Sequence, residues 1–435
     1  MKYSIYNSII HVDKDNLLLY NANSDKFLII TQKSKEDIDK GVDFLKAENT
    51  KLFQKLQETK AIVSDSTDEV AELQNKIQKI LEDDTCFELH INPTLDCNFN
   101  CWYCYEDHIK GSFMNKEILK ATQEFIGHTL NRKGLKNFHL SFFGGEPLLY
   151  FKRIALPLIH FALEQCKIHN IAFSSHFTSN GFLVNDYTLE CLDGINVDFQ
   201  ITLDGNETTH NQTRFLKNGM GSYSIICRNI IAIAEHRHNV CLRINYTLQN
   251  INSILSKLHS FENISRDVKK YINVDFQRVW QDTDKDKASA DDLHDELYSL
   301  FKKFKDAGFC CSFHKVQNTV ENPCYGDKKN NLLINYDGKV FSCTARKFTS
   351  DNCEGILSTK GKIIWKGNLK ERRIHSKFSR KECHQCVIAP ICGGCCTQKN
   401  IEMNKISGCL RGLSQDDKKQ VILDRFEFMF LNNNN

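Results

Sequence analysis

Two groups of cysteines supply the side chains most able to do chemistry in this sequence. The first group places three thiols within eight residues, Cys97-Asn-Phe-Asn-Cys101-Trp-Tyr-Cys104. The second group is spread over the C-terminal part and comprises Cys324, Cys343, Cys383, Cys386, Cys392, Cys396 and Cys409. Cysteine thiolate is the usual protein ligand of iron–sulfur clusters and of structural zinc. Nineteen cysteines in a chain with no sign of secretion therefore indicate metal ligation rather than disulfides.

The first group favours an iron–sulfur cluster. Three thiolates in one loop can converge on one metal centre, whereas a structural zinc site needs a fourth Cys or His ligand. His90 and His108 are near in the sequence, so zinc stays an alternative by counting alone. Three cysteines without a fourth suggest a cubane with one iron open to another ligand. The cysteines scattered singly among apolar residues are interpreted as buried small hydrophobes, namely Cys166, Cys191, Cys227 and Cys241.

Strands and helices must alternate around this loop between about residues 86 and 280. Six strands are predicted, at 87–94, 138–145, 171–180, 197–205, 241–248 and 273–279. Such alternation predicts an α/β fold with a parallel sheet. Apolar residues alternate with polar ones, as Phe199 and Ile201 do with Gln200 and Thr202, so one sheet face should be polar. We therefore expect an open, partial (β/α)6 TIM-type barrel with a ligand inside, and an antiparallel sheet with one wet face is the alternative.

Short motifs follow the ends of these strands. They are Gly144-Gly145-Glu146-Pro147 after the second strand, Asn180-Gly181 after the third, and Thr202-Leu203-Asp204-Gly205 after the fourth. Together with the C-x3-C-x2-C run and the aromatic Tyr103, this order resembles the radical S-adenosylmethionine (SAM) superfamily. The resemblance implies a [4Fe–4S] cluster on Cys97, Cys101 and Cys104, whose open iron is chelated by the amino and carboxylate groups of SAM. It also implies reductive cleavage of SAM to a 5′-deoxyadenosyl radical that abstracts a hydrogen atom.

The resemblance also implies a set of SAM contacts. These are Gly144, Gly145, Glu146, Pro147, Asn180, Thr202 and Arg214. The two glycines are expected to let the backbone approach the SAM ammonium, and Thr202 keeps the hydroxyl of the family's usual Ser. His210 follows at the family's spacing but is not counted as a contact. No residue is assigned as the catalytic acid, base or hydrogen donor, and the candidates near the polar interior are Asp198, Asp204, Arg243 and Asp275.

The second cysteine group begins around a predicted β-hairpin. The segments LLINY and KVFSC flank Asp337-Gly338. This pattern is a strong signal for a tight hairpin turn, and the returning strand ends in Cys343. The seven cysteines closely resemble a SPASM domain, which binds two auxiliary [4Fe–4S] clusters, and a zinc ribbon would leave three of them unexplained. The resemblance assigns the outer cluster to Cys383, Cys386, Cys392 and Cys409. It assigns the inner cluster to Cys324, Cys343 and Cys396, which makes three [4Fe–4S] clusters in all.

The fourth ligand of the inner cluster is left open by the sequence. Some members of the family have an eighth cysteine shortly after the first, where this chain has Asn330 and Asn331. The inner cluster either keeps an open iron or uses Cys353 or another spare thiol. An open iron would suggest direct binding of a substrate thiolate.

The chain is expected to form three domains, at 1–85, 86–305 and 306–435. The first contains no cysteine and reads as a small α+β module with strands at 3–12 and 17–31. A helix should follow the capping residues of 64–68, with Val70, Leu73, Ile77 and Ile80 along one face. The second is the partial barrel, and the third is the SPASM domain.

Composition excludes some classes of partner. The chain has 435 residues with 41% hydrophobic and 26% charged residues, and its net charge is +3. This charge predicts no strong attraction to nucleic acid or membrane. The N-terminus lacks a signal-peptide pattern, and no apolar run approaches the roughly 20 residues that span a bilayer. The expected location is cytoplasmic.

The resemblance implies a peptide substrate, because SPASM-type enzymes mostly act on peptides or proteins. We expect a maturase that forms a thioether or carbon–carbon cross-link in a ribosomally made precursor, with an electron donor such as flavodoxin or ferredoxin. Residues 1–85 would grip the leader peptide by strand addition, with a structural cap as the alternative. A sulfatase-maturing enzyme is a second possibility, although such enzymes have an Asp where Thr344 follows Cys343. A non-catalytic electron carrier or peptide-binding relative is a third.

Overall fold

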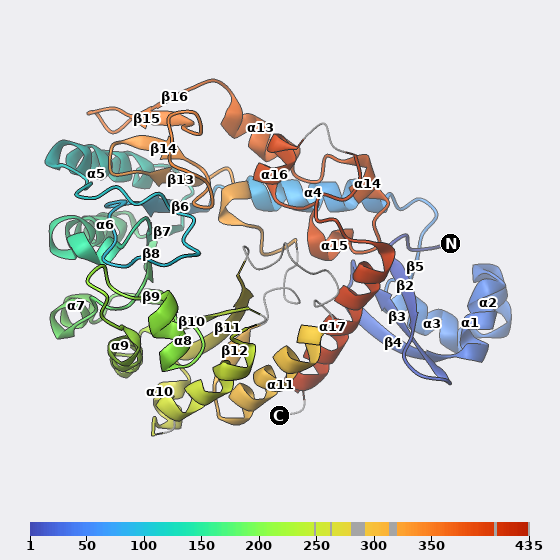
Figure 1. Ribbon diagram of the computed structural model, residues 1–435. Coiled ribbons are helices and arrows are strands. Elements are labelled where there is room, and N and C mark those ends of the chain that lie inside the picture. Colours follow the sequence, from blue (N-terminus) through green and yellow to red (C-terminus); the bar gives the residue numbers. More distant parts are fainter. Residues whose placement is uncertain (248, 262, 280–291, 313–319, 404–406, 434–435) are drawn as a thin grey trace. The chain divides into compact units, whose positions relative to one another are not determined.

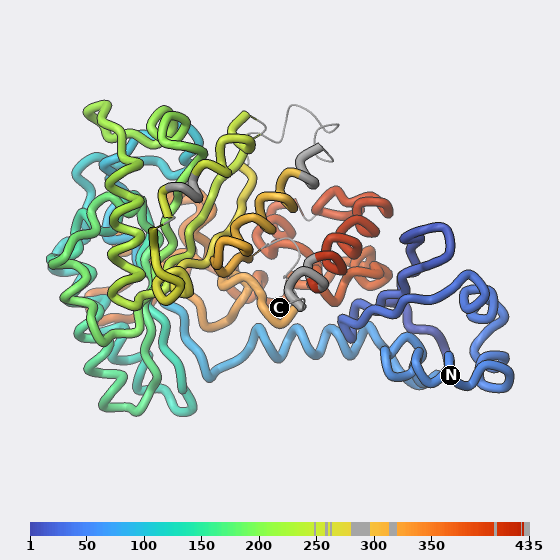
Figure 2. Tube along the Cα trace, turned by 90° about the horizontal axis from the view of Figure 1, so that it is seen from below, coloured from blue at the N-terminus to red at the C-terminus, as the bar shows by residue number. Residues whose placement is uncertain are grey.

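The computed structural model describes residues 1–247, 249–261, 263–279, 292–312, 320–403 and 407–433. It divides into two compact units, and each contains segments that are distant in the sequence. One unit comprises 1–83, 315–329 and 370–435, so the two ends of the chain (blue and red in Figure 2) belong to the same unit. The other comprises 84–314 and 330–369. The boundaries of these two units differ from those of the three expected domains. The three domains were defined by expected function, and they stay a prediction.

The larger unit is built on a parallel sheet. Its parallel strands are β6 (Cys86–Ile91), β7 (Asn137–Phe142), β8 (Ala172–Ser179), β9 (Val197–Thr202), β10 (Asn239–Tyr246), β11 (Ile272–Arg278) and β12 (Cys310–Ser312). They follow one another in this order across the sheet. All six predicted strands are confirmed, although Leu248 lies outside the described residues. The parallel direction excludes the antiparallel alternative, and β12 is an additional strand.

Helices cover one face of these strands (Figure 1). The helical elements of this unit are α5 (Lys116–Leu130), η1 (Pro147–Tyr150), η2 (Phe151–Ala155), α6 (Leu156–His169), α7 (Asp186–Leu192), α8 (Glu207–Thr213), α9 (Tyr223–Glu235), η3 (Ile251–Phe261), α10 (Arg266–Lys269) and α11 (Asp292–Asp306). The buried face is aromatic, because Phe142, Phe177 and Phe199 stack across three neighbouring strands. Such stacked rings add attraction beyond the area that they bury.

The opposite sheet face carries the polar residues that the sequence predicted. In β9 the residues Val197, Phe199 and Ile201 are buried, whereas the residues between them are partly exposed. The strand register places Thr202, Arg243 and Asp275 side by side on β9, β10 and β11. The fold is therefore the expected partial (β/α) barrel with a polar inner face.

Four more strands extend the sheet beyond β6. They are β13 (Asn331–Ile334), β14 (Lys339–Phe341), β15 (Gly355–Leu357) and β16 (Ile363–Trp365). The hairpin predicted around Gly338 is formed by β13 and β14, and Gly338 has a φ of 78°. Strand β13 also pairs in parallel with β6. The hairpin that ends in Cys343 thus belongs to the barrel sheet.

The smaller unit begins with a three-stranded antiparallel sheet, β2 (Asn7–His11), β3 (Asn16–Asn21) and β4 (Lys26–Thr31). The other elements of the N-terminal module are β1 (Lys2–Tyr3), α1 (Gln32–Asp39), α2 (Val42–Glu48), α3 (Thr50–Glu58), β5 (Ile62–Val63) and α4 (Glu69–Leu81). The predicted strand at 17–31 is in fact two strands joined by a turn, in which Asp25 has a φ of 54°. Leu17, Leu19 and Ile30 pack with α1 to α3 in one hydrophobic cluster.

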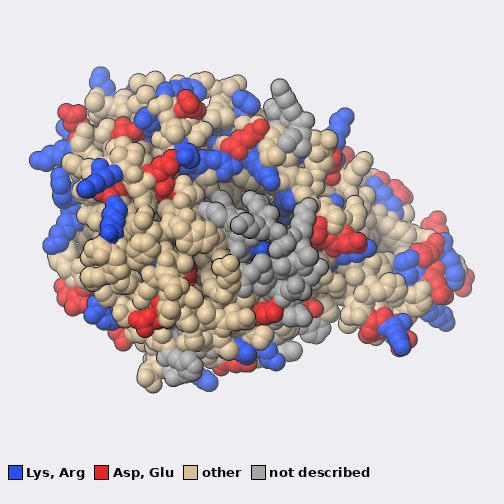
Figure 3. All heavy atoms as spheres, in the orientation of Figure 1, with Lys and Arg blue, Asp and Glu red and all other residues tan. Residues whose placement is uncertain are grey.

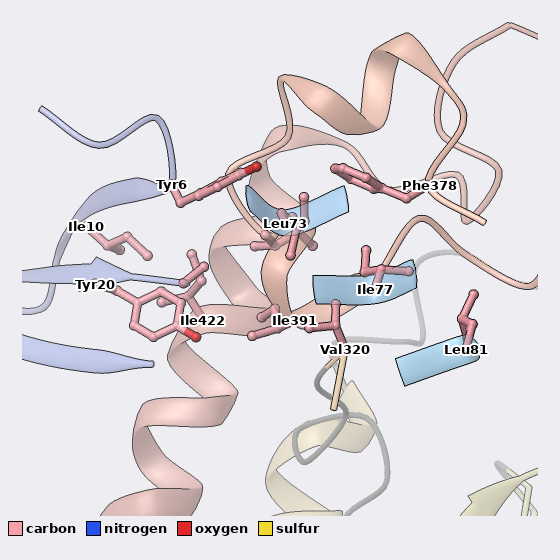
Figure 4. Close-up of a cluster of buried hydrophobic side chains, with 13 residues drawn as sticks. Tyr6, Ile10, Tyr20, Leu73, Ile77, Leu81, Val320, Phe378, Ile391 and Ile422 are labelled. Atoms are coloured by element: carbon pink, nitrogen blue, oxygen red, sulfur yellow. The ribbon is translucent and has the colours of Figure 1, made fainter. Parts of the chain in front are cut away.

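The other sheet face packs with the C-terminal part of the chain. That part contains η6 (Tyr325–Asp327), α13 (Leu369–Ser376), α14 (Lys381–His384), α15 (Ala389–Cys392), α16 (Thr397–Glu402) and α17 (Gln415–Asn433). Figure 4 shows the common cluster, where Tyr20 of β3 and Leu73 of α4 lie with Phe378, Ile391 and Ile422. The N-terminal module and the segment with the predicted outer-cluster cysteines therefore share a hydrophobic core.

Surface charge agrees with the small net charge. Lysine and arginine are interspersed with aspartate and glutamate over the face seen in Figure 3. Among the helices of the described residues, none is both long enough and apolar enough to cross a membrane.

Candidate functional site

The loop after β6 carries the first three cysteines. Cys97 is buried, Cys101 is partly buried and Cys104 is exposed. Burial raises the pKa of Cys97 to about 12, with further contributions from Glu146 and from Cys101 and Cys104. The three thiols therefore lie near enough to affect one another, and a bound metal would favour their thiolate forms.

Two glycines hold this loop against the end of β7. The backbone N–H of Gly145 donates to the Thr94 carbonyl over 3.1 Å, and that of Glu146 donates to the Asp96 carbonyl over 2.8 Å. A Cβ on Gly144 would lie 2.4 Å from the Thr94 carbonyl oxygen, and one on Gly145 would lie 2.1 Å from that of Asp96. Glycine is therefore required at both positions by the close approach of the cysteine loop, and the contact with the SAM ammonium stays a prediction.

Glu146 is fully buried and joins two strand ends. Its carboxylate accepts hydrogen bonds from the Ser179 hydroxyl (2.8 Å), the Asn180 backbone (2.8 Å) and the Leu148 backbone (3.0 Å). Burial raises the pKa of Glu146, while these hydrogen bonds oppose the shift. Both carboxylate oxygens of Glu146 are thus occupied by hydrogen bonds from the protein itself. The next residue, Pro147, begins η1.

Asn180 connects the third strand to the cysteine loop. Its side-chain nitrogen lies 2.7 Å from the Asn98 side-chain carbonyl oxygen and 3.8 Å from the Cys97 sulfur. Asn180 is 8% exposed and follows β8 directly. The structure thus brings this predicted contact to the first cysteine.

Arg214 reaches the cysteine loop through Tyr103. Its guanidinium donates to the Tyr103 hydroxyl over 2.9 Å, and this hydroxyl donates to Asp204. Burial acts to lower the pKa of Arg214, but Tyr103, Cys101 and Asp204 raise it. The guanidinium is therefore a fixed positive charge near Cys101. Thr202 ends β9 two residues before Asp204.

His210 supports this network, although it is not counted among the predicted contacts. It is fully buried, and its Nδ1 accepts from the Asp204 backbone N–H over 3.2 Å. Its Nε2 lies 3.0 Å from the Ser222 hydroxyl, which donates to the Arg214 carbonyl over 2.7 Å. The signal in the sequence was its spacing after the Thr202–Gly205 turn. Its role is positional because it contacts the backbone of Asp204 and reaches that of Arg214 through Ser222.

Asp96 fixes the start of the cysteine loop. Its carboxylate accepts from the backbone of Cys97 (2.9 Å) and Gly111 (2.8 Å) and pairs with Lys217 at 2.8 Å. Asp96, Asn98 and Lys217 were not predicted, since nothing in a single sequence separates them from ordinary loop residues.

The residues fit an iron–sulfur cluster better than a single zinc ion. His108 lies near Cys104, with Nε2 3.5 Å from the sulfur, so one histidine is within reach. Within the described ranges, however, no three His, Cys, Asp or Glu side chains converge as ligands of one ion would. A cubane separates its thiolate ligands more widely than a single ion does, because each cysteine binds a different iron.

A model of the radical SAM superfamily matches residues 91–258, which include the first cysteine loop and Gly144-Gly145-Glu146-Pro147. Residues 91–258 of this chain therefore form a radical SAM domain. The radical SAM cyclopropyl synthase TigE of Paramaledivibacter caminithermalis is 23% identical over 332 residues, which cover 69% of this chain and 65% of TigE. The chain spans 36% of the length of another curated relative.

Two solved structures share the fold of this radical SAM protein. Native anSMEcpe with bound AdoMet and Cp18Cys peptide has a TM-score of 0.59 at 19% identity, over 80% of this chain and 98% of that one. Streptococcus suis SuiB bound to precursor peptide SuiA has a TM-score of 0.52 at 15% identity, over 92% of this chain and 97% of SuiB. The prediction of a radical SAM fold is thereby confirmed.

Four C-terminal cysteines of this radical SAM protein lie near one another. Burial raises the pKa of Cys383 to about 11, and Cys392, Cys386 and Cys409 raise it further. Cys383, Cys386 and Cys392 also pack against the core shown in Figure 4. These are the four residues predicted to hold the outer cluster. Cys324 and Cys396 belong to the same unit, whereas Cys343 belongs to the barrel unit.

The residues discussed for the fourth ligand of the predicted inner cluster have protein partners in the structure. Asn331 is 1% exposed and donates to the Ser342 carbonyl, while Asn330 donates to Asp84. Cys353 is buried in a cluster with Leu333 and Phe341, and its thiol donates to the Gly355 carbonyl over 2.9 Å. Cys353 is thus engaged in packing. Cys395, which the sequence left without an assigned role, lies near Cys392 and Cys396.

The isolated cysteines divide into two kinds. Cys166 and Cys227 are buried, as predicted. Cys191 is only partly buried, and so is Cys241, which alternates with buried residues of β10. The buried-hydrophobe interpretation is therefore wrong for Cys241, because its strand position faces the polar side of the sheet.

Proposed function

We propose that this chain is a radical SAM enzyme that modifies a peptide, forming a thioether or carbon–carbon cross-link in a ribosomally synthesised precursor. The observation that carries the proposal is the seating of the Cys97–Cys104 loop on Gly144 and Gly145, beside Asn180 and Arg214. A [4Fe–4S] cluster held there would supply the electron that cleaves SAM to the 5′-deoxyadenosyl radical. The protein's part is to position SAM and exclude water.

The proposed SAM contacts are Gly144, Gly145, Pro147, Asn180, Thr202 and Arg214. For Glu146 we propose an indirect role, because its carboxylate is occupied by Ser179, Asn180 and Leu148. Arg214 is suited to a carboxylate, since its Nε has no hydrogen-bond partner among the described residues and its charge is fixed.

Two auxiliary [4Fe–4S] clusters complete the proposal. Cys383, Cys386, Cys392 and Cys409 would hold the outer one, and Cys324, Cys343 and Cys396 would ligate the inner one. The grouping of the first four thiols around Cys383 supports the outer assignment. An electron donor such as flavodoxin or ferredoxin would supply the reducing electron.

The N-terminal module is proposed to bind the leader of the precursor. Its β2–β3–β4 sheet has two edges, and β4 carries Ile29, which is 56% exposed. Strand addition to such an edge is a common way to bind an extended peptide. The likeness of the fold to SuiB, solved with precursor peptide SuiA, is consistent with this role.

The first test is anaerobic incubation of the reconstituted protein with SAM and a strong reductant, assayed for 5′-deoxyadenosine. Product is expected from the wild type and not from the variant in which Cys97, Cys101 and Cys104 are all Ala. If iron-replete protein makes no product, with or without a candidate precursor peptide, the enzymatic proposal fails and a non-catalytic relative is favoured.

A further inference from the structure

A row of polar residues crosses the inner face of the barrel sheet from the cysteine loop outward. Asn180, next to Cys97, directly follows β8. The register then aligns Thr202 of β9 with Arg243 of β10, Asp275 of β11 and Ser312 of β12. Neighbouring strands are about 4.8 Å apart, so Arg243 stands roughly 10 Å across the sheet from the strand of Asn180.

Arg243 is the member of this row with unused binding capacity. Its Nε donates to the Asn245 side chain over 3.0 Å, and Asn245 is 7% exposed. This bond fixes the plane of the guanidinium. Within the described part of the chain, the two outer nitrogens of Arg243 have no hydrogen-bond partner or ion pair. The side chain is only partly exposed, so it keeps a positive charge on the inner face without full hydration.

A carboxylate is the group that suits this arrangement. A guanidinium presents its donors in a planar fork that matches the two oxygens of a carboxylate, and such paired bonds are stronger than neutral ones. Asp275 is adjacent in the register, but its carboxylate accepts from Gln277 over 2.9 Å instead. The two outer nitrogens of the Arg243 guanidinium are therefore available to a ligand, although the acidic Asp275 is adjacent.

The carboxylate of SAM is not the expected occupant. Arg214 is the cation whose charge acts on Cys101 and Cys104, at the cluster where SAM would chelate iron. The charge of Arg243 acts instead on Cys241, further along the inner face. Two arginines therefore serve different parts of the site, and the second is available to the substrate.

We infer that Arg243 binds a carboxylate of the peptide substrate, so that the segment presented to the barrel contains an aspartate or glutamate. This inference rests on the proposed function and narrows its substrate class. It assigns Arg243 a role in selecting substrate, with Asn245 as the residue that orients it. Asp275 limits the affinity for the carboxylate by charge repulsion.

The test is an affinity selection of short random peptides, displayed as a library, on the anaerobically reconstituted protein with SAM present. Wild-type protein is expected to enrich Asp and Glu at one peptide position. Arg243→Gln should reduce that enrichment about tenfold, the loss expected for one charge-assisted pair. Asp275→Asn should increase it. Arg243→Lys, which keeps the charge without the fork, should be intermediate and serves if the Gln variant folds poorly.

Two outcomes overturn the inference. Equal acidic enrichment by wild type and Arg243→Gln would show that another residue selects the peptide. A loss of SAM affinity of about tenfold or more in Arg243→Gln, measured by equilibrium dialysis, would assign Arg243 to the carboxylate of SAM. The proposed function fails separately, if wild-type protein enriches no peptide and none of the recovered peptides stimulates 5′-deoxyadenosine formation.

Discussion

Gly145 shows at the scale of one residue how the first cysteine loop is positioned. A methyl group at this position would lie 2.1 Å from the Asp96 carbonyl oxygen, which is backbone and cannot rotate away. We predict that Gly145→Ala displaces the loop and abolishes 5′-deoxyadenosine formation, with a loss of iron at the first cluster. Iron content, electron paramagnetic resonance and product assays measure these effects.

Gly127→Ala is the matched control for this prediction. Gly127 lies within α5, and a methyl group added to it would meet no atom of the described residues within 4 Å outside its own helical turn. Alanine is favoured over glycine in a helix, so this variant should be more stable by about 0.5–1 kcal/mol and fully active. A Gly145→Ala protein with wild-type product formation would contradict the steric account of the motif.

Cys353 gives a second prediction at this scale. Its thiol is buried with Leu333 and Phe341 and donates to the Gly355 carbonyl, so it is engaged in packing. Cys353→Ala should therefore keep the iron content and cluster spectra of the wild type, with a loss of about 1 kcal/mol in stability. An altered cluster spectrum would show instead that Cys353 is a ligand, as one of the sequence-based alternatives for the predicted inner cluster has it. Cys395→Ala tests the other spare thiol in the same assay.

The sequence identified which residues belong to the site better than it identified the structural role of each. The cysteine run and the Gly144–Pro147 motif could be recognised because they are local patterns. The tasks of Glu146 and His210 depend on partners that are distant along the chain, 33 residues away for Ser179 and 12 residues away for Ser222. Such contacts depend on how strand ends meet, which a single sequence does not specify.

At the scale of elements, the β3–β4 turn is tied to α17 by a paired salt bridge. Arg425 donates to both carboxylate oxygens of Asp25, which also accepts from the Tyr20 hydroxyl. We predict that Arg425→Gln lowers the free energy of unfolding by about 1–2 kcal/mol, discounted because Asp25 is partly exposed. Lys419→Gln on the same helix removes an exposed pair with Asp416 and should cost less than about 0.5 kcal/mol.

The same salt bridge predicts that its contribution to the free energy of unfolding does not change with pH near neutrality. Burial acts to raise the pKa of Asp25, but Arg425 and Tyr20 hold it below its usual value. A depressed carboxyl pKa contributes stability that is present above the unfolded value and is lost only as pH falls through the folded one. The difference in stability between wild type and Arg425→Gln should thus be equal at about pH 6 and about pH 8, as thermal melts can measure. A difference that shrinks between these values would contradict this.

Long, regular elements were predictable, and tertiary pairing was not. Six strands of the barrel follow from alternation, and Asp68 caps α4 by accepting from the Ala71 backbone over 3.0 Å. The face of α4 is only partly as predicted, because Leu81 is buried where Ile80 was expected. The parallel pairing of β13 with β6 joins segments 243 residues apart at Leu333 and His90, a relation that local patterns cannot reveal.

At the scale of the molecule, the N-terminal module is part of the unit that carries the cysteines predicted to hold the outer cluster. Buried residues from β2, β3 and α4 share one core with Phe378, Ile391 and Ile422, and Cys383 packs against it. Sequence alone suggested an independent module, since its composition and patterns are self-consistent. The shared core means that the packing around the cysteines depends on both ends of the chain.

Deleting residues 1–83 is consequently predicted to damage more than leader binding. The truncated chain would expose apolar side chains from the common core, such as Phe378 and Ile422, and burial of such side chains is the main stabilising term in folding. We expect the protein to aggregate or to purify with less iron, whereas Ile29→Glu on β4 should reduce binding of a candidate precursor peptide and leave the iron content unchanged. Ile168→Glu, at an exposed apolar position of α6 in the barrel unit, is its control. A soluble truncated protein with wild-type iron content and spectra would show that the C-terminal cysteine segment folds without the module.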